Sequence, residues 1–186
     1  MSPIILVLMN GRPLDLTIED SLADAILEVW YPGTSGGLGV ADILFGKYNP
    51  SAKLPITFPR NLGQVPIYYN VKNTGRPISK ENPTEDYKSN YIDSPNTPLY
   101  PFGHGLSYTT FKYSEIKLSS DKVKESEILK ASSTITNTGD FDGHEVVQLY
   151  IRDKVGSITR PIKELKGFKK IFLKKGESKT VVFEIY

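Results

Sequence analysis

Residues 98–111, PLYPFGHGLSYTTF, divide the sequence into two parts with different patterns of apolar residues. Before this stretch, apolar residues occur in continuous runs or at helical spacing, and after it they alternate with polar residues. Continuous runs are typical of strands buried on both faces of a parallel sheet, and alternation is typical of half-buried strands. We therefore predict an α/β part followed by an all-β part.

The dividing stretch contains residue types that are also used in catalysis. His104 and Ser107, taken with Asp93, could supply a hydrolase triad. The nucleophile elbow of such enzymes has the motif G-x-S-x-G, which the sequence around Ser107 does not complete. We interpret the stretch as a turn at a domain junction and not as an active site.

A turn also explains the other residues of this stretch. Pro101, Gly103 and Gly105 supply the fixed and positive φ values that tight turns use. Apolar side chains then anchor the chain where it passes from one domain to the next; they are Phe102, Leu106, Tyr108 and Phe111.

Composition excludes several classes of function. The 186 residues are 39% apolar with a net charge of +2, so the chain is globular and nucleic acid is not an expected partner. With no Cys and two His, it lacks disulfides, a thiol nucleophile and a histidine-rich metal cluster, and we expect no metal and no cofactor. The apolar run Ile4–Met9 is too short to span a membrane, which is also not expected as a partner.

The first 60 residues have the pattern of a doubly wound α/β domain. Residues 4–9 and 25–30 are apolar runs that predict strands, and residues 36–45 have a helical period. Leu54–Phe58 contains a proline and suits an edge or final strand. Three strands with so little helix cannot cover both faces of a sheet, so we expect further strands upstream.

The remaining chain predicts a crossing segment and a sandwich. Residues 61–98 lack sustained periodicity and are read as an ordered crossing between domains. Alternating runs predict strands at residues 111–118, 129–137, 146–152 and 181–185, with turns at 137–140 and 174–177. These strands suggest an antiparallel sandwich that is incomplete at its end, and a chain cut in this way is expected to be poorly stable alone.

Several motifs in register resemble the C-terminal part of bacterial β-glucosidases of glycoside hydrolase family 3. The motifs are LVLMNGRP (6–13), YPGTSGG (31–37), DILFG (42–46), YNPSAKLP (48–55), NTGRP (73–77), LYPFGHGLSY (99–108) and LKGF (165–168). The resemblance implies the end of an α/β sandwich domain in residues 1–60, an ordered interdomain crossing segment in 61–104, and a fibronectin type III-like domain in 105–186 that we expect to be truncated in this chain.

The resemblance also implies what the parent enzyme does. It would be an exo-acting retaining β-glucosidase that hydrolyses terminal β-D-glucosyl residues of β-glucosides or oligosaccharides, without metal or organic cofactor. Both catalytic carboxylates of the family lie on segments upstream, the nucleophile on a TIM barrel, so we assign no catalytic residue here and expect this chain alone to be inactive. The parent is expected to be periplasmic or secreted, with the cytoplasm as an alternative, and a homodimer is a further expectation.

Ligands of open α/β sheets gather at the carboxyl ends of the strands. This rule places Asn10, Arg12, Trp30 and Tyr31 near a ligand edge, and we predict Asn10, Arg12 and Trp30 as substrate-proximal. Arg12 would bind a sugar or a carboxylate or would instead tie down a loop, and Trp30 would stack on a sugar or lie in the core. Arg76 in the crossing segment is a fourth substrate-proximal candidate, reaching toward a neighbouring domain or subunit.

The glycine-rich turn and the sandwich each allow an alternative interpretation. Residues 33–39, GTSGGLG, follow a strand as a phosphate loop would, but they match no nucleotide-binding motif and suit close approach of the helix to the sheet. The rival function is a stand-alone carbohydrate-binding or adhesion module, which predicts an aromatic platform on one sheet face. The aromatic residues of the sandwich mostly occupy alternate positions that we expect to face a core; they are Phe111, Tyr113, Phe141, Tyr150, Phe168, Phe172 and Phe183.

Overall fold

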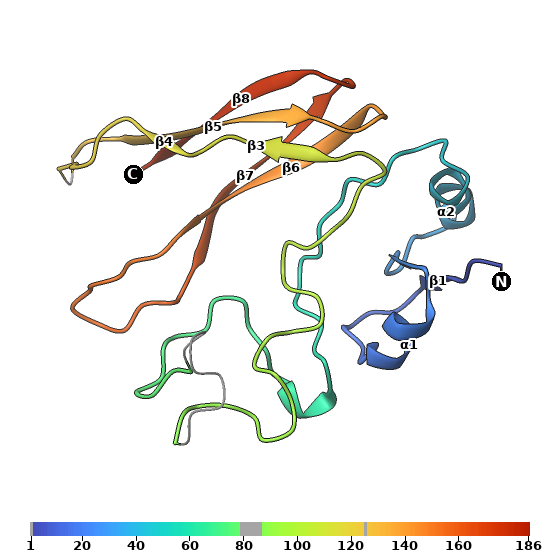
Figure 1. Ribbon diagram of the computed structural model, residues 1–186, viewed down its shortest axis with the longest axis horizontal. Coiled ribbons are helices and arrows are strands. Elements are labelled where there is room, and N and C mark those ends of the chain that lie inside the picture. The colour runs from blue at the N-terminus through green and yellow to red at the C-terminus, as the bar shows by residue number, and fades with distance from the viewer. Residues whose placement is uncertain (1, 79–86, 125) are drawn as a thin grey trace. The chain divides into compact units, whose positions relative to one another are not determined.

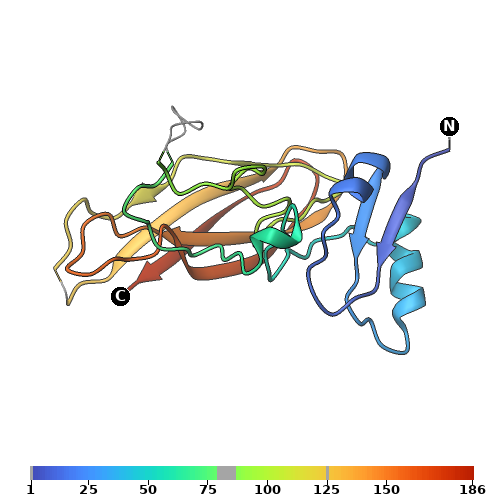
Figure 2. The same ribbon diagram turned by 90° about the horizontal axis from the view of Figure 1, so that it is seen from below.

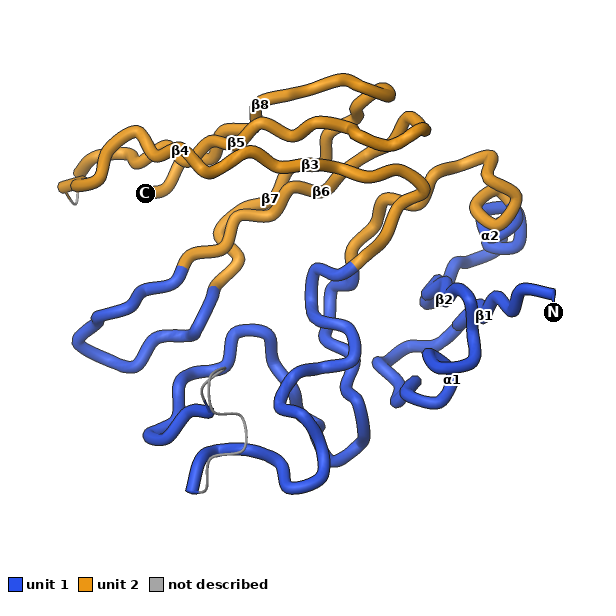
Figure 3. The backbone as a smooth tube through the Cα atoms, viewed as in Figure 1, with its two compact units in different colours: residues 1–41, 54–104, 152–163 blue, residues 42–53, 105–151, 164–186 orange. Residues whose placement is uncertain are grey.

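The computed structural model describes residues 2–78, 87–124 and 126–186, so part of the predicted crossing segment lies outside the described residues. The chain forms two compact units (Figure 3), and each is described by itself. Unit 1 contains residues 1–41, 54–104 and 152–163, and unit 2 contains residues 42–53, 105–151 and 164–186.

Unit 1 is built around two parallel strands. β1 (Ile5–Leu8) and β2 (Ala25–Glu28) pair in register from Ile5 opposite Ala25 to Leu8 opposite Glu28, and they lie side by side in Figure 2. The intervening helix α1 (Thr17–Leu22) was not predicted, because its six residues are too few to show a helical period. Helix α2 (Gly36–Leu44) confirms the predicted helix after the glycine-rich turn.

The prediction of a strand at Leu54–Phe58 was wrong. This segment makes an isolated bridge between Phe58 and Tyr100, and its other backbone bonds join Phe58 to Leu99 and Leu54 to Gly103 and His104. Phe58 is nevertheless 1% exposed. Phe58 is therefore buried in irregular backbone, whereas Ile56 is 44% exposed. The apolar pattern alone does not separate this case from a strand.

Unit 2 holds an antiparallel β-sandwich (Figure 1). In one sheet β5 (Leu129–Asn137) pairs with β8 (Ser178–Ile185) along one edge and with the short β3 (Phe111–Tyr113) and β4 (Lys117–Leu118) along the other. The second sheet pairs β6 (Gly143–Ile151) with β7 (Glu164–Leu173). The predicted strands in these regions are confirmed, with the run at 111–118 divided in two.

The core of the sandwich is formed by inward residues of both sheets. Its buried members are Ile135, Val147, Ile171, Leu173 and Val181, with Phe111 and Phe183 packed against them. Side chains alternate between the two faces of a strand, so burial of Ile171 and Leu173 turns Phe172 and Phe168 outward. Their exposed fractions are 45% and 67%.

The expectation that the sandwich aromatics mostly face a core was therefore wrong for part of the set. Phe141 is also exposed, and the even-numbered positions of β6 put Tyr150 on the same outer face as Gln148, to which its hydroxyl donates at 2.5 Å. An alternating pattern fixes which residues share a face but not which of the two faces is buried.

The stretch that divides the sequence forms a turn. Gly103 has a φ of 81°, and the His104 N–H donates to the Pro101 carbonyl. Gly105 acts differently from the prediction: it lacks a positive φ, and a Cβ there would collide with the carbonyl oxygen of Ala52. Leu106 is 78% exposed, so it does not serve as the predicted apolar anchor.

The polar residues of this stretch are used in structure. The Ser107 hydroxyl donates to Asn49 Oδ1 at 2.8 Å, and the His104 ring stacks on Tyr100 with ring centroids 5.2 Å apart. Since Ser107 directs its proton to an amide oxygen, the geometry is that of a loop contact and not of an activated nucleophile.

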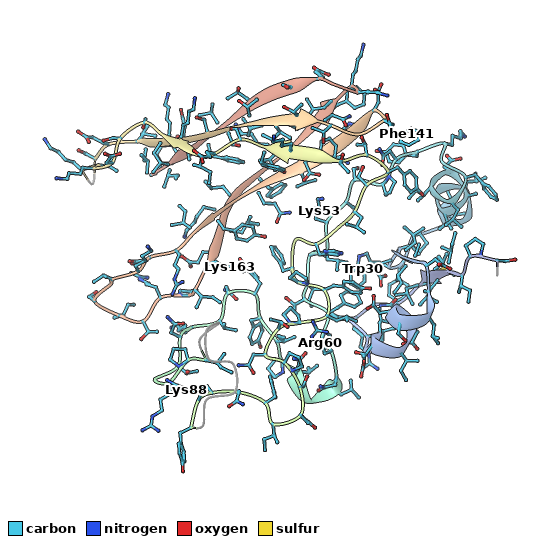
Figure 4. All side chains as sticks on the ribbon, in the orientation of Figure 1. Trp30, Lys53, Arg60, Lys88, Phe141 and Lys163 are labelled. Atoms are coloured by element: carbon cyan, nitrogen blue, oxygen red, sulfur yellow. The ribbon has the colours of Figure 1, made fainter. Side chains whose placement is uncertain are left out.

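Unit 2 also contains a buried polar network. Lys53, labelled in Figure 4, pairs with Glu145 at 3.2 Å and donates to the Gly105 carbonyl at 2.7 Å. The Tyr113 hydroxyl donates to the other oxygen of Glu145 at 2.8 Å. Burial, then this hydrogen bond, raise the pKa of the Tyr113 hydroxyl. The network attaches the residues after α2 to the first strands of the sandwich.

Candidate ligand-facing site

The loops that follow β1 and β2 form the candidate site in unit 1. The parallel ladder ends with the Val29 N–H donating to the Leu8 carbonyl at 3.0 Å. Asn10 and Trp30 stand two residues beyond the last residues of their strands, Leu8 and Glu28. Parallel pairing therefore puts these two predicted residues at the same carboxyl edge of the sheet.

Asn10 shapes its own loop. Its amide nitrogen donates to the Arg12 carbonyl at 2.6 Å, which closes the turn between the two residues. Asn10 Oδ1 is buried and has no hydrogen-bond partner among the described residues. The Arg12 residue is exposed, so its guanidinium is carried at the surface of a loop whose backbone is fixed by Asn10.

Glu28 and Trp30 form the corresponding turn after β2. The Trp30 N–H donates to Glu28 Oε1 at 2.8 Å, and Trp30 has a φ of 52°. A left-handed backbone at a bulky aromatic residue costs about 1–3 kcal/mol and persists only where surrounding contacts enforce it. Such strain is concentrated at functional sites.

The Glu28 carboxylate is poorly solvated. Burial raises the pKa of Glu28 above its ordinary value, an effect opposed by the hydrogen bond from Trp30 and by the neighbouring Asn10 amide. Its second oxygen, Oε2, is buried and has no partner among the described residues. Two acceptor oxygens, one from Asn10 and one from Glu28, are thus left unpaired within the described chain.

The side chains of Trp30 and Tyr31 have different surroundings. Trp30 is half-buried and packs against Phe58, with ring centroids 6.0 Å apart (Figure 4 labels Trp30). Tyr31 is 79% exposed and lies across Gly11, where a Cβ would come within 2.8 Å of the tyrosine ring. The two loops therefore touch through Tyr31 and Gly11, next to Arg12.

The described contacts of Arg76 are with the crossing segment and not with these loops. It is exposed, and its carbonyl accepts from the Ser89 N–H at 2.9 Å, beside a bridge between Pro77 and Ser89. Among the described residues, no hydrogen bond or ion pair links its side chain to the loops after β1 and β2. The structure thus brings together Asn10, Arg12 and Trp30 but not Arg76.

The glycine-rich turn after Tyr31 uses its glycines for backbone geometry and close packing. Gly33 has a φ of 71°, and Gly36 is covered by the ring of Pro32, which leaves no space for a Cβ. The close approach that we predicted was of the helix to the sheet, whereas the contact found at Gly36 is with Pro32. The positions of Gly37 and Gly39 have open space where a Cβ would lie.

Chemically, the site offers a guanidinium, aromatic rings and carboxamide and carboxylate acceptors. These groups bind hydroxyl-rich ligands through paired hydrogen bonds and stacking. Glu28 was not among the residues predicted for the site. A signal for it exists in the sequence, since it is the single charged residue inside the apolar run Ala25–Trp30.

Within the described part of the chain, no cluster of three or more His, Asp or Glu residues could hold a metal ion. No helix among the same residues is long and apolar enough to cross a membrane.

The fold, an α/β part followed by a β-sandwich, agrees with comparisons to known families. Residues 1–108 match the glycosyl hydrolase family 3 C-terminal domain, and residues 145–186 match the fibronectin type III-like domain. The chain belongs to glycosyl hydrolase family 3.

Individual relatives support the same assignment. A periplasmic beta-glucosidase of Salmonella typhimurium is 57% identical over 183 residues, which are 98% of this chain and 24% of that protein. A beta-xylosidase of Formosa agariphila is 45% identical over 98% of the chain. The crystal structure of beta-glucosidase from Listeria innocua in complex with isofagomine superposes with a TM-score of 0.92 at 48% identity, covering 99% of this chain and 26% of that one. The chain spans about a quarter of the length of these relatives.

Proposed function

We propose that this chain is the C-terminal part of an exo-acting, retaining β-glucosidase and that its own role is structural and ligand-positioning. The observation that carries the proposal is the match to beta-glucosidases along 98% of the chain but 24% of the relative's length. A retaining glycosidase needs two carboxyl groups about 5 Å apart across the glycosidic bond. The family resemblance assigns both to segments outside the sequence given.

Residues 1–60 would then complete an α/β domain, residues 61–104 would cross to the next domain, and residues 105–186 would form a fibronectin type III-like domain. The long match to the family 3 C-terminal domain and the second match at residues 145–186 support this division. The longer protein would include a TIM barrel, and homodimerisation belongs to the same proposal.

Asn10, Arg12, Trp30 and Arg76 would be the substrate-proximal residues of the longer enzyme. The shared carboxyl edge of β1 and β2 and the left-handed backbone at Trp30 support the first three. The substrate would be a β-glucoside or oligosaccharide; the Listeria innocua enzyme is described in complexes with glucose and laminaribiose. The name of the Salmonella relative supports a periplasmic location.

A chimera tests the proposal. This chain would replace the matching 183 residues of the Salmonella typhimurium beta-glucosidase. We expect the chimera to release p-nitrophenol from the aryl β-glucoside and the chain alone, rigorously repurified, to release none. In the chimera, Arg12→Ala should raise KM, whereas the exposed control Arg152→Ala should not.

Two results would contradict the proposal. One is turnover by the chain alone that is lost when one of its own acidic residues is replaced. The other is a folded chimera with no activity, since the chain would then not serve the function of the segment it replaces.

A second candidate role is carbohydrate binding by the sandwich. It is favoured by one observation, the outward position of Phe168 and Phe172 on β7, with Gln148 opposite Phe168 and His144 opposite Phe172 on β6. Affinity electrophoresis in soluble β-glucan tests it. Retardation of the unmodified chain that is lost in the double variant Phe168→Ala, Phe172→Ala and kept in the control Phe45→Ala would support this role. Equal mobility of the unmodified chain, the double variant and the control would exclude it.

A further inference from the structure

We propose that Glu28 is a positioning residue of the candidate site, one that holds Trp30 in its left-handed backbone and thereby sets Tyr31 across Gly11 beside Arg12. The inference deepens the proposed function and rests on it for its importance to substrate binding. The local mechanism can be tested without any substrate.

The first step is the end of the β ladder. Val29 still donates to the Leu8 carbonyl, but the next N–H, that of Trp30, has turned away from β1 and donates to Glu28 Oε1 at 2.8 Å. A half-buried backbone N–H without a partner is costly. The Glu28 side chain therefore replaces the strand as the acceptor where the backbone leaves the sheet.

The second step is the conformation of Trp30. A φ of 52° is disfavoured for a residue with a bulky side chain, so it needs contacts that enforce it. Two contacts do so in the structure: the Glu28 carboxylate fixes the N–H, and Phe58 packs against the ring at 6.0 Å between centroids.

The third step leads from Trp30 to the neighbouring loop. The turn at Trp30 directs Tyr31 over Gly11, close enough that a Cβ at Gly11 would lie 2.8 Å from the tyrosine ring. On the other side, Asn10 closes the Gly11 loop through the Arg12 carbonyl. A change in the Trp30 backbone would therefore move Tyr31 away from Gly11 and from the loop that carries Arg12.

A further observation separates this role from simple stabilisation. Burial raises the pKa of Glu28, so the ionised carboxylate is held where its surroundings disfavour the charge. Its Oε2 also has no partner among the described residues. A carboxylate in these surroundings costs stability, which agrees with a role in setting the Trp30 backbone.

Trp30 is the only tryptophan of the chain, so its fluorescence reports directly on this position. We would compare Glu28→Gln, Glu28→Asp and Glu28→Ala in the full 186-residue chain. Gln keeps an acceptor oxygen at the same place, Asp keeps the charge but withdraws it by one methylene, and Ala removes both. The control is Glu19→Ala, an exposed glutamate in α1.

Glu28→Gln should keep the emission maximum of Trp30 and its quenching by acrylamide, whereas Glu28→Asp and Glu28→Ala should shift the emission to the red and raise the quenching constant by about twofold or more. The control should match the parent chain. If Glu28→Ala does not fold, the contrast between Gln and Asp decides.

Wild-type emission in Glu28→Ala or Glu28→Asp would overturn the proposal. A red shift and a rise in quenching in Glu28→Gln equal to those in Glu28→Asp would overturn it too. The readout involves no sugar. A positive result here with an inactive chimera would therefore contradict the proposed function alone.

Discussion

Lys53 Nζ lies 3.2 Å from Glu145 Oε2, and the exposed fractions of the two side chains are 16% and 10%. The pair joins two segments that are far apart in the sequence, the one after α2 and β6, and it is completed by Tyr113 and the Gly105 carbonyl. A buried ion pair adds little net stability compared with apolar residues, but removal of one partner leaves an uncompensated charge.

We therefore predict that Lys53→Met or Glu145→Gln lowers the free energy of unfolding by about 3–5 kcal/mol, and that the double substitution Lys53→Met with Glu145→Leu recovers much of the loss. Urea unfolding measures both. The exposed pair Lys130–Glu184, with a similar contact distance of 3.3 Å, is the control, and Lys130→Met should cost less than about 1 kcal/mol. Equal losses at the two lysines would show that burial of the first pair is unimportant.

Asn137, at the end of β5, is 0% exposed and uses its whole side chain. It accepts from the Thr109 hydroxyl at 2.7 Å and donates to the carbonyls of Phe141 and Leu173 at 2.8 and 3.2 Å. Asn137→Ala should lower the free energy of unfolding by about 2–4 kcal/mol, because the partners lose their bonds inside the protein.

Asn137→Asp should be at least as damaging as Asn137→Ala, since it places an acceptor against two carbonyl oxygens. Thermal unfolding of both variants, with the surface substitution Asn73→Ala as the control, checks this expectation. A small loss of thermal stability in Asn137→Asp would mean that the two donated hydrogen bonds contribute little.

Tyr100 gives unit 1 a dependence on alkaline pH. Burial and the hydrogen bond to Asp20 raise the pKa of Tyr100 to about 12 from 10.0. Because the folded state holds this proton more tightly than the unfolded state, the contribution is complete below pH 10.0 and is lost as the pH rises toward about 12.

Tyr100→Phe should therefore flatten part of the fall in urea midpoint above pH 10.0, and absorbance at 295 nm should show one fewer late-titrating tyrosine. Tyr68→Phe, at an exposed position, is the control. A variant with an unchanged alkaline fall would contradict the assignment. Tyr113→Phe should act separately, since its raised pKa comes from burial and Glu145.

Substitution of the two glycines in the dividing stretch should lower stability for different reasons. Gly103→Ala places a side chain at a φ of 81°, which costs about 1–2 kcal/mol. Gly105→Ala pushes a methyl group into the Ala52 carbonyl, and relief of such a contact costs about 1–3 kcal/mol. In the matched control Gly75→Ala, nothing lies within 4 Å of the new Cβ. An Asn at each position separates the causes, since Asn tolerates the left-handed backbone and should rescue position 103 but not 105.

Sequence by itself determined the elements whose pattern is long and periodic. The residues of β5 and of helix α2 were predictable, because alternation or helical spacing over eight or more residues indicates the type of element. The turn at 174–177 was predictable from its turn-forming residues. The carboxyl edge with Asn10 and Trp30 was also predictable, since parallel strands must end on the same side.

Tertiary structure alone decided which apolar residues are covered and which polar atoms meet. The same alternation would have buried Phe168 and Phe172 had β7 presented its other face, and Phe58 was buried although residues 54–58 form no strand. The pairing of Glu28 with Trp30 depends on where the backbone leaves the sheet, and that of Lys53 with Glu145 depends on contact across 92 residues. Local sequence sets backbone preference and periodicity. Burial and long-range pairing depend instead on contacts between distant segments, and the sequence pattern of one segment alone does not show which other segment it will contact.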